Sequence, residues 1–511
     1  MTGAEPIAVL QFTETEPAPR FDRRVLVVAA TLFIVLMLLS ALYGFHRDEL
    51  YFLDAGRHLQ GGYVDQPVLV PLLARLSSSL FGVSLPGLRL WPALAAFATV
   101  VVAALSAREL GGTRRAQLLA AIGAATMPAL LAIDHLLGPT SIDVLVWATL
   151  GWLVLRVDRT RDTRLWLVAG AVVAVGVANK HSVVFFALAL LVGALVTGGG
   201  PLLANRWLLA GVVVAAAGAL PDLIWQSQHS WATVAMTRRL NEKNGGLANI
   251  GVWIGGQFIM TAFALIPVWV TGLRRLWHSR RPLRRAISIS YVALFVFFAV
   301  TTGAKIYYLA GAYVPLLAAG AVSIDAALTA RQKSSQAILG WVAVSTAVAL
   351  PLVLPVLPPS DIGWTYAVNQ VPGESLGWNS FVREVQRTWT ALPPAVQSQT
   401  AIITADYGEA GAVNVLGRPL GLPRAYGTQN SEWWWDPPPA SDNYVLSIAP
   451  GPIDVTHYDR YLRRFFTDVR VVATLHNSFG IHNEEWGGHI YLCTGRRGPW
   501  SVVWPKLRHY D

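Results

Sequence analysis

The chain has 511 residues, of which 54% are hydrophobic and only 14% are charged. Soluble domains carry about 25% charged residues, so this composition excludes an ordinary soluble protein and indicates a polytopic membrane protein. The net charge of +10 comes from residues 1–357, with 28 Lys/Arg against 16 Asp/Glu, whereas residues 358–511 hold 12 and 14. The positive charge therefore orients membrane spans and does not indicate nucleic-acid binding. A single cysteine, Cys493, excludes an internal disulfide and a cysteine-built metal site.

Apolar segments long enough to cross a bilayer recur along the first two thirds of the chain. The first of them has no small-residue cleavage site after it, so we expect a signal anchor behind a cytoplasmic tail over residues 1–24. We predict an α-helical transmembrane domain over residues 25–357 with about eleven spans, at 25–44, 89–107, 116–133, 141–156, 165–179, 182–198, 207–224, 251–273, 286–302, 309–328 and 337–357.

Basic residues in the loops set the orientation of these spans. If the N-terminus is cytoplasmic, 19 of the 28 Lys and Arg residues fall in inner loops, six of them between Arg274 and Arg285. The opposite orientation would translocate that block, which the positive-inside rule disfavours. We therefore expect a multi-pass protein of the cell inner or plasma membrane with its polar and acidic loops outside. An odd number of spans also places the C-terminal part outside.

The pattern becomes that of a soluble domain after a proline-rich stretch, residues 351–360. We predict an extracytoplasmic α/β domain over residues 358–511 with a partly parallel sheet, because strand and helix patterns alternate there. We expect a strand, a turn and a helix in 401–417, further strands at 443–450, 470–475 and 489–494, and an amphipathic helix at 459–469.

The first outer loop, residues 45–88, is the predicted catalytic loop, because it concentrates carboxylates directly after the first span. Asp48, Glu49, Asp54 and Asp65 all lie within 18 residues. Acids in such a place either take part in chemistry or keep the loop in water. Asp48 is the stronger candidate for chemistry, since it sits at the exit of the span where water meets lipid. For Asp54 both interpretations stay open.

Two short helices are expected in this loop. The first, over residues 48–59, would lie on the membrane surface and end at Gly61-Gly62. The second would begin at Pro67, a favourable first helical position, and stop at Gly82. Two interfacial helices that carry acids would form the rim of a cavity.

The motifs of this loop resemble those of a known family. RDELYF and GGYVDQPVLVP resemble the first outer loop of bacterial polyprenyl-phosphate-dependent GT-C glycosyltransferases, related to protein O-mannosyltransferases (family 39-like), aminoarabinose transferases and galacturonosyltransferase-like enzymes. The second proline of the family's segment is replaced in DQPVL, which is a mild departure. The resemblance covers most of the chain, and continues in LLGPTSIDVLVW (136–147), ANKHSVVFF (178–186), KIYYLAGAYVPLLAAGA (305–321) and ADYGEAGAVNVLG (405–417).

The resemblance implies an inverting transfer of a sugar from a polyprenyl-phosphate donor to an acceptor outside the membrane. The acceptor would be a glycolipid, a cell-envelope polysaccharide or a protein. Asp48 is implied as the general base, because a carboxylate is ionised at neutral pH and can take the proton of an acceptor hydroxyl. Glu49 would orient the acceptor or Asp48, or else be a solvated neighbour.

The leaving polyprenyl phosphate requires cations near the outer membrane surface. The candidates for phosphate binding are Arg47, Lys180, Lys305 and the neighbouring Tyr307. Lys180 lies between two apolar runs with no compensating acid nearby in the sequence. A lone lysine at a helix end can also extend to the lipid headgroups, and this alternative stays open for Lys180 and Lys305.

Four further residues are expected to contact the acceptor or to line the pocket: Asp65, Gln66, Asp143 and His181. The resemblance places Asp143 where related transferases carry an Asp that binds the acceptor or, in some members, a metal. It therefore leaves room for a divalent metal at Asp143. His181 would bind the phosphate or line a short turn.

Two other classes of protein are alternatives. The many spans and charges would suit a lipid or sugar transporter or flippase, but the sequence has no internal repeat and its acids gather in outer loops. A non-catalytic scaffold of envelope assembly would use the C-terminal domain as its binding module. In a scaffold, replacing Asp48 by Asn would have no consequence.

Overall fold

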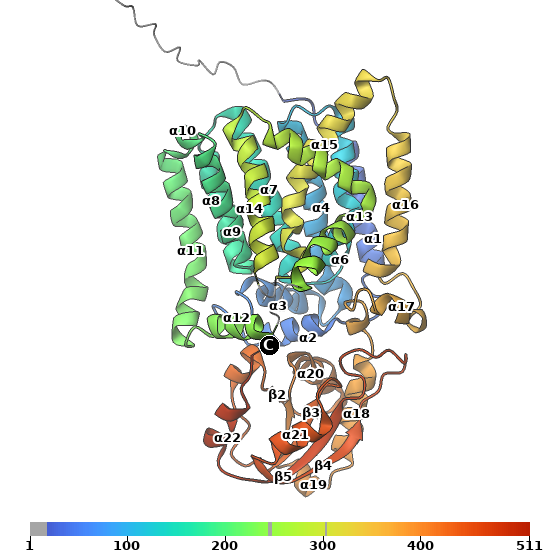
Figure 1. The fold of residues 1–511 in the computed structure, drawn as a ribbon. Helices are drawn as coiled ribbons and strands as arrows, with labels where there is room; N and C mark the ends of the chain where they lie inside the picture. Colours follow the sequence, from blue (N-terminus) through green and yellow to red (C-terminus); the bar gives the residue numbers. More distant parts are fainter. Residues whose placement is uncertain (1–17, 244–247, 302–303, 511) are drawn as a thin grey trace, which may run out of the picture.

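The computed structural model describes residues 18–243, 248–301 and 304–510. Most of the predicted tail over residues 1–24 therefore lies outside the described residues. A bundle of long helices carries a smaller domain with a β-sheet at one end, and three short helices lie flat between the two parts (Figure 1). The boundary expected at 357/358 falls between the last long helix, which ends at Val353, and a 3-10 helix that begins at Pro359.

The predicted polytopic helical membrane protein is confirmed. Within the described residues, seven helices are long and apolar enough to cross a membrane, and a bent pair makes an eighth, with a 58° angle before Pro128. Each of the eleven predicted spans coincides with a helix or with this pair. The bundle consists of α1 (Arg24–Leu39), α4 (Leu85–Glu109), α5 (Arg114–Ala125), α6 (Pro128–Asp134), α7 (Pro139–Thr160), α8 (Leu165–Asn179), α9 (Ser182–Val196), α10 (Gly200–Leu203), α11 (Arg206–Gln228), α13 (Ala248–Trp277), α14 (Pro282–Val300), η1 (Ile306–Leu309), α15 (Ala310–Ala330) and α16 (Gln336–Val353).

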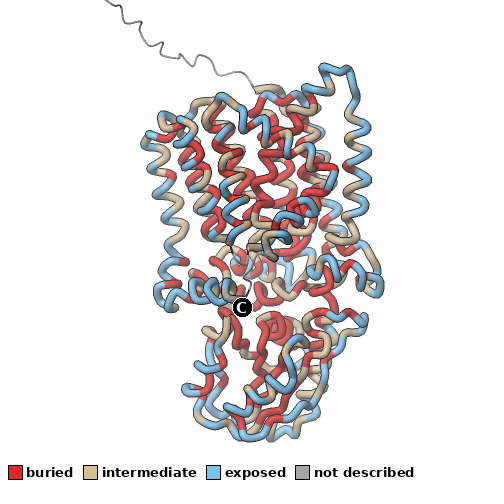
Figure 2. The backbone as a smooth tube through the Cα atoms, viewed as in Figure 1, coloured by how far each residue is buried: buried red, intermediate tan, exposed pale blue. Residues whose placement is uncertain are grey.

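α15 is the central helix of the bundle, and α11 and α16 lie at its edges. In the most apolar stretch of the segment that contains α15, 83% of the residues are buried, against 11% in the corresponding stretches of α11 and α16. Figure 2 shows α11 and α16 mostly in pale blue and tan, the colours of exposed and half-buried residues. α13 and α15 approach closely where Gly272 and Gly320 face each other's backbone, since a Cβ on either glycine would overlap a carbonyl oxygen of the partner helix. Small residues allow such close packing where lipid replaces water.

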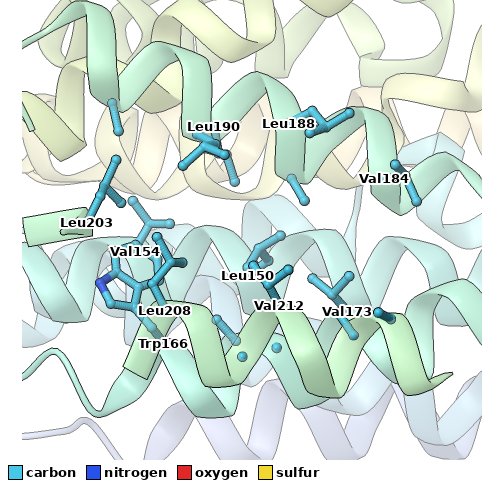
Figure 3. Close-up of a pocket in the computed structure, with 18 of the residues that line it drawn as sticks. Leu150, Val154, Trp166, Val173, Val184, Leu188, Leu190, Leu203, Leu208 and Val212 are labelled. Carbon is cyan, nitrogen blue, oxygen red and sulfur yellow. The ribbon is translucent and has the colours of Figure 1, made fainter. Parts of the chain in front are cut away.

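An apolar cavity of about 350 Å³ lies among α7, α8, α9 and α11 (Figure 3). Leu150 and Val154 come from α7, Val173 from α8, Leu188 from α9 and Val212 from α11. The described residues that line it include no charged side chain. The cavity therefore suits hydrocarbon, and polar chemistry has to lie elsewhere.

The three interfacial helices are α2 (Arg47–Ala55), α3 (Leu69–Phe81) and α12 (Ala232–Lys243). α2 ends at Ala55, four residues earlier than the predicted helix over 48–59. The next residue, Gly56, packs against the carbonyl of Pro71 in α3 with no room for a Cβ. α3 begins two residues after Pro67 and stops, as predicted, before Gly82. Seven residues of α2 are buried, so the expected surface helix is instead enclosed between bundle and outer domain.

The C-terminal domain, residues 359–510, has the predicted α/β fold with a partly parallel sheet; it is named the outer domain for its expected placement. Its five strands run in the order β2-β1-β3-β5-β4, and β1 is parallel to β2 and β3 while β5 is antiparallel to β3 and β4. The strands are β1 (Thr400–Thr404), β2 (Ala425–Gly427), β3 (Tyr444–Ala449), β4 (Phe466–Thr474) and β5 (His489–Arg496). The remaining elements are η2 (Pro359–Asp361), α17 (Gly363–Tyr366), η3 (Gly373–Ser375), α18 (Trp378–Thr390), α19 (Pro394–Gln397), α20 (Tyr407–Ala412), η4 (Val413–Gly417), η5 (Arg418–Leu420), η6 (Asn430–Trp435), α21 (Val455–Leu462) and α22 (Trp500–Leu507).

One predicted element of this domain is wrong. The helix expected over 459–469 ends at Leu462, and Phe466 begins strand β4. Phe466 pairs with Arg496 and Val469 with Cys493 across β5. The buried residues of this strand, Phe466 and Val469, are three positions apart, a spacing that an amphipathic helix also shows. The pairing with β5 makes the segment a strand.

The two faces of the sheet pack on different helices. Ile402 and Leu446 on one face share a core with Leu50 and Phe52 of α2, whereas Ile403 on the other face packs in the core that includes α21 and α22. α2 therefore belongs to the core of the outer domain as much as to the bundle. This double packing fixes the helix that carries Asp48.

Candidate active site

A cavity of about 490 Å³ is lined by residues of α2 and α6 and of the outer domain. α2 and α6 lie at the end of the bundle that faces the outer domain (Figure 1). Apolar side chains of α6, α13 and α16 form much of its wall. Its polar lining comes from segments far apart in the sequence: His46, Asp48, Asp65, Gln66, Thr140, Ser141, Lys180, Tyr307, Tyr308, Asn369 and Tyr407. The cavity thus combines a long apolar wall with acids and a lysine, as a charged lipid substrate requires.

Asp48 is placed by the first turn of α2. His46 caps this helix, because its Nδ1 accepts the Asp48 N–H at 3.1 Å while the Glu49 carboxylate accepts the His46 N–H at 2.9 Å. Such a capping box fixes where the helix begins. Asp48 therefore stands at the N-terminal end of a helix, where the helix dipole favours a carboxylate.

Asp48 is exposed to the cavity and remains hydrogen-bonded. Its Oδ1 accepts from the Tyr407 hydroxyl at 2.9 Å and lies 3.6 Å from Arg47 Nε, and the side chain is 41% exposed. Burial by itself would raise the pKa of Asp48, but His46, Arg47 and the Tyr407 hydroxyl outweigh it and bring the pKa below its usual range. Asp48 is therefore an ionised carboxylate that a substrate can reach.

Glu49, predicted to assist Asp48, points away from the cavity. It is fully buried, with Arg89 Nε at 3.0 Å, Arg89 Nη2 at 2.8 Å and the Leu137 N–H at 3.0 Å from its oxygens. Burial opposes ionisation of Glu49, but the charge and hydrogen bonds of Arg89 outweigh it and lower the pKa. Arg89 also donates to the Ser40 carbonyl at 2.7 Å. Glu49 thus joins α2 to α4, and its place in the catalytic pair stays a prediction.

Asp65 and Gln66 line the cavity side by side. The Tyr51 hydroxyl donates to Asp65 Oδ1 at 2.6 Å, and Ser431 Oγ donates to the same oxygen at 3.3 Å. Burial, with a contribution from Asp48, raises the pKa of Asp65 to about 6. Gln66 is 4% exposed, and its side-chain amide has no hydrogen-bond partner among the described residues. A buried amide without a partner is costly, so Gln66 is available to a ligand in the cavity.

Lys180 and Tyr307 also come together in the cavity. The Lys180 Nζ lies 5.3 Å from the ring centre of Tyr307, 4.9 Å from that of Tyr308 and 3.4 Å from Thr140 Oγ1. These rings hold the ammonium group at the cavity wall by cation–π contacts. Burial lowers the pKa of Lys180, and the charge of Asp143 opposes this shift. Lys180 therefore presents its amino group to the cavity.

Two other predicted phosphate ligands lie elsewhere. Arg47 forms an ion pair with Glu484 and lies over the ring of Tyr407, with 5.3 Å from its guanidinium carbon to the ring centre. Lys305 is exposed at the start of η1. Neither is among the residues that line the cavity. A contact with the donor phosphate stays a prediction for both.

Asp143 and His181 have protein partners outside the cavity lining. Ser182 Oγ lies 2.7 Å from both carboxylate oxygens of Asp143, and His181 Nε2 lies 2.8 Å from Asp222 Oδ2 on α11. Among the described residues no group of three or more His, Cys, Asp or Glu could hold a metal ion. A metal at Asp143 stays a prediction without such a group to support it.

Sequence reasoning missed several residues of this site. Tyr407 contacts Asp48 across 359 positions of the sequence, and Arg89 contacts Glu49 across 40. Tyr308 could have been predicted from the sequence, because it follows the predicted residue Tyr307 directly. The segment that contains Tyr407 carried a signal, because it is part of the family resemblance, but nothing in it indicated a contact with α2.

Known proteins that resemble this chain share its arrangement. Residues 65–225 match the family model of dolichyl-phosphate-mannose-protein mannosyltransferase. ArnT from Cupriavidus metallidurans, solved with bound undecaprenyl phosphate, is 13% identical with a TM-score of 0.58, and the alignment covers 91% of this chain and 97% of that one. Its apo structure gives 14% identity, a TM-score of 0.57 and coverages of 92% and 97%. The fold is that of the GT-C glycosyltransferases. The resemblance drawn from the sequence is thus confirmed.

A larger GT-C protein shares the fold more distantly. The arabinofuranosyltransferase AftD from Mycobacteria is 15% identical with a TM-score of 0.50, and the alignment covers 94% of this chain but 40% of AftD. A search among curated proteins gives no match. The segment matched by the family model includes Asp65, Gln66 and Lys180. The match to the mannosyltransferase family model therefore covers part of the cavity lining and supports the prediction of a glycosyltransferase.

Proposed function

We propose that this protein is an integral membrane glycosyltransferase that transfers a sugar from a polyprenyl-phosphate donor to an acceptor outside the membrane, with inversion at the anomeric carbon. The carrying observation is the cavity itself, which places the ionised Asp48 and the Lys180 ammonium on one apolar-walled space. A base and a cation on opposite sides of a transferred group are what this displacement needs. The acceptor is a glycolipid, an envelope polysaccharide or a protein.

The donor enters along the apolar wall. Side chains of α6, α13 and α16, among them Ile133, Met260 and Leu352, match the hydrocarbon of a polyprenyl chain. Lys180 binds the phosphate, with the rings of Tyr307 and Tyr308 beside it. The fold shared with an ArnT structure that holds undecaprenyl phosphate supports this choice of lipid.

Asp48 acts as the general base of a single displacement. It takes the proton of the acceptor hydroxyl while that oxygen bonds to the anomeric carbon. The bond from this carbon to the phosphate oxygen breaks at the same time, and polyprenyl phosphate leaves with the electron pair. Lys180 stabilises the charge that develops on the phosphate. Because the acceptor attacks the face opposite the leaving group, the configuration inverts.

The orientation follows from the distribution of basic residues. Arg108 donates to the carbonyl of Pro19, five residues before α1, and Arg159 at the end of α7 pairs with Glu109 at the end of α4. The described chain enters α1 at the end of the bundle away from the outer domain (Figure 1). The positive-inside rule assigns that end to the cytoplasm. The cavity and the outer domain then lie outside the inner or plasma membrane.

The test uses full-length protein in lipid nanodiscs and a panel of polyprenyl-phosphate sugars with candidate acceptors. Wild type should release polyprenyl phosphate, and Asp48→Asn should lower the rate by roughly 10²–10⁴-fold, the usual contribution of a general base. The matched control is Asp361→Asn, an exposed carboxylate in η2 outside the cavity lining, which should turn over at the wild-type rate.

Other outcomes favour the alternatives. If Asp48→Asn releases polyprenyl phosphate as fast as wild type, Asp48 is not the base. If wild type releases none from any donor but moves lipid across proteoliposomes, the protein is a transporter.

A further inference from the structure

A second polar cavity, of about 370 Å³, is lined by the outer domain and by Arg239 of α12, and Asp48 is not among its lining residues. One wall is the sheet face with Ile403 of β1 and Ser447 of β3, and the opposite wall is α21 and the chain end after α22. Ala405 and Thr428 line it just beyond the carboxyl ends of β1 and β2. The carboxyl end of parallel strands is where open α/β sheets bind ligands, next to the point where the strand order reverses. Here β1 is that point, since β2 and β3 flank it.

The charged residues and histidines that line this cavity are all basic. They come from three separate segments, namely α12, α21 and the C-terminal stretch: Arg239, His457, Lys506, Arg508 and His509. None of the described residues that line it is an Asp or Glu. Concave surfaces of one charge focus the field and attract ligands of the opposite charge. An anion is therefore the ligand that this lining favours.

Hydroxyl groups and aromatic rings form the inner part of the cavity. Ser447 Oγ and the Tyr458 hydroxyl lie 3.1 Å apart, and Tyr461 lines the cavity beside Tyr458 with 5.8 Å between ring centres. Hydroxyls that both donate and accept, next to aromatic faces, suit the hydroxyl groups and apolar faces of a sugar. The lining as a whole suits a sugar that also carries negative charge.

One short helix connects this cavity with the catalytic one. The guanidinium carbon of Arg508 lies 4.6 Å from the ring centre of Trp433 in η6. In the same helix Ser431 Oγ accepts the Val64 N–H at 2.8 Å and donates to Asp65 at 3.3 Å. A ligand held by the basic cavity therefore rests on the element that contacts the catalytic loop.

We propose that the basic cavity is an acceptor-recognition site for an anionic glycan, a sugar unit that bears a phosphate or a carboxylate. Lys506 and Arg239 contact the anionic group, and Tyr458 and Tyr461 contact the sugar. That this glycan is the acceptor rests on the proposed function. Binding of the glycan to the cavity can be measured without any sugar transfer.

The experiment measures binding of trigalacturonate by isothermal titration calorimetry to full-length protein in zwitterionic nanodiscs. Maltotriose serves as the neutral trisaccharide and inorganic phosphate as the free anion. Trigalacturonate should bind more tightly than both, and Lys506→Glu should weaken it roughly ten-fold or more, the effect of losing a charged hydrogen bond. The matched control is Arg470→Glu, an exposed residue of β4 outside the cavity, which should bind like wild type.

Contrary results separate this proposal from the proposed function. Equal binding by Lys506→Glu and Arg470→Glu, or phosphate binding as tight as that of trigalacturonate, overturns the glycan site. If wild type releases polyprenyl phosphate but does not bind trigalacturonate, the transferase proposal stands and the glycan site fails. If Lys506-dependent binding is present while Asp48→Asn is fully active, the glycan site stands and the catalytic proposal fails.

Discussion

Two short helices, α2 and α20, meet beside the candidate catalytic cavity, and they begin with the same hydrogen-bond pattern. In α2 the Glu49 carboxylate accepts the N–H of its cap residue His46 at 2.9 Å, and in α20 Glu409 accepts the N–H of Asp406 at 3.1 Å. Both glutamates are fully buried. The two helices also touch, since a Cβ on Gly411 of α20 would lie 2.8 Å from the Leu50 carbonyl oxygen. By local structure alone these two ends are equivalent.

Their surroundings make them electrostatically opposite. Glu49 pairs with Arg89 at 2.8 Å, which lowers the pKa of Glu49 against the effect of burial. Around Glu409 the neighbours are carboxylates, and burial followed by the charge of Asp406 raises the pKa of Glu409 to about 8. Burial and Glu409 likewise raise the pKa of Glu485. A capping box therefore fixes where a helix starts, and long-range neighbours decide whether its carboxylate is charged.

The largest effect is expected from Arg89→Met, which removes the cation from the α2 end. Glu49 would then be a buried carboxylate with only backbone donors, and breaking a buried ion pair in this way costs about 3–5 kcal/mol. We expect a much lower thermal unfolding midpoint in detergent and loss of activity. The double variant Arg89→Met/Glu49→Gln should recover part of the midpoint, because the buried group is neutral. A midpoint of Arg89→Met equal to that of wild type would contradict the assigned role of this pair.

Much of the fold is predictable from the sequence because it depends on local pattern. Apolar runs indicated the helices of the bundle, because a helix in lipid must be apolar and must satisfy its own backbone hydrogen bonds. Seven of these helices, or eight with the bent pair, are long and apolar enough to cross a membrane among the described residues, whereas α1, α8 and α9 are shorter. The alternation of strands and helices indicated the α/β domain. The failure over 459–469 shows the limit, because Phe466 is a strand residue only by its pairing with Arg496 of β5.

The candidate site was predictable only in part. Asp48, Asp65 and Lys180 were identified from acids near a span, a lone lysine and the family resemblance, and the structure brings them to one cavity. The partners that set their charge are distant in sequence, as Tyr407 is from Asp48, and no local pattern encodes such contacts. Glu49 shows the same limit, since only Arg89 distinguishes a buried structural pair from a second catalytic acid.

Glu409→Gln tests the α20 end, with a smaller effect. A carboxyl whose folded pKa is about 8, against an ordinary value of 4.5, binds more protons when folded than when unfolded. The free energy of unfolding should therefore fall as the pH rises from about 4.5 to about 8, by up to about 1.4 kcal/mol per pH unit. Glu409→Gln keeps the capping acceptor without the titration, so its unfolding midpoint should depend less on pH and exceed that of wild type near pH 8.

The matched variant in α2, Glu49→Gln, should change the pH dependence of the unfolding midpoint in the opposite direction. The folded pKa of Glu49 is lowered, so its contribution is present at neutral pH and lost in acid. Glu49→Gln should therefore lose stability at neutral pH, and its midpoint should approach that of wild type as the pH falls. If both glutamine variants change the pH dependence in the same direction, the electrostatic contrast between the two helices is wrong.

The smallest effect is expected where the two helix ends meet. Tyr407, the first residue of α20, donates its hydroxyl to Asp48 at 2.9 Å, and this bond helps to hold the pKa of Asp48 low. Tyr407→Phe removes one hydrogen bond to a carboxylate, so we expect kcat to fall by roughly 5–20-fold and the acid limb of the pH–rate profile for polyprenyl-phosphate release to move to higher pH. The control is Tyr366→Phe, which removes a tyrosine hydroxyl that donates to Glu374, a residue outside the cavity lining. This control should leave the acid limb at its wild-type pH. An unchanged limb in Tyr407→Phe would show that α20 does not tune the base, and that the charge of Asp48 is set within α2 by His46 and Arg47.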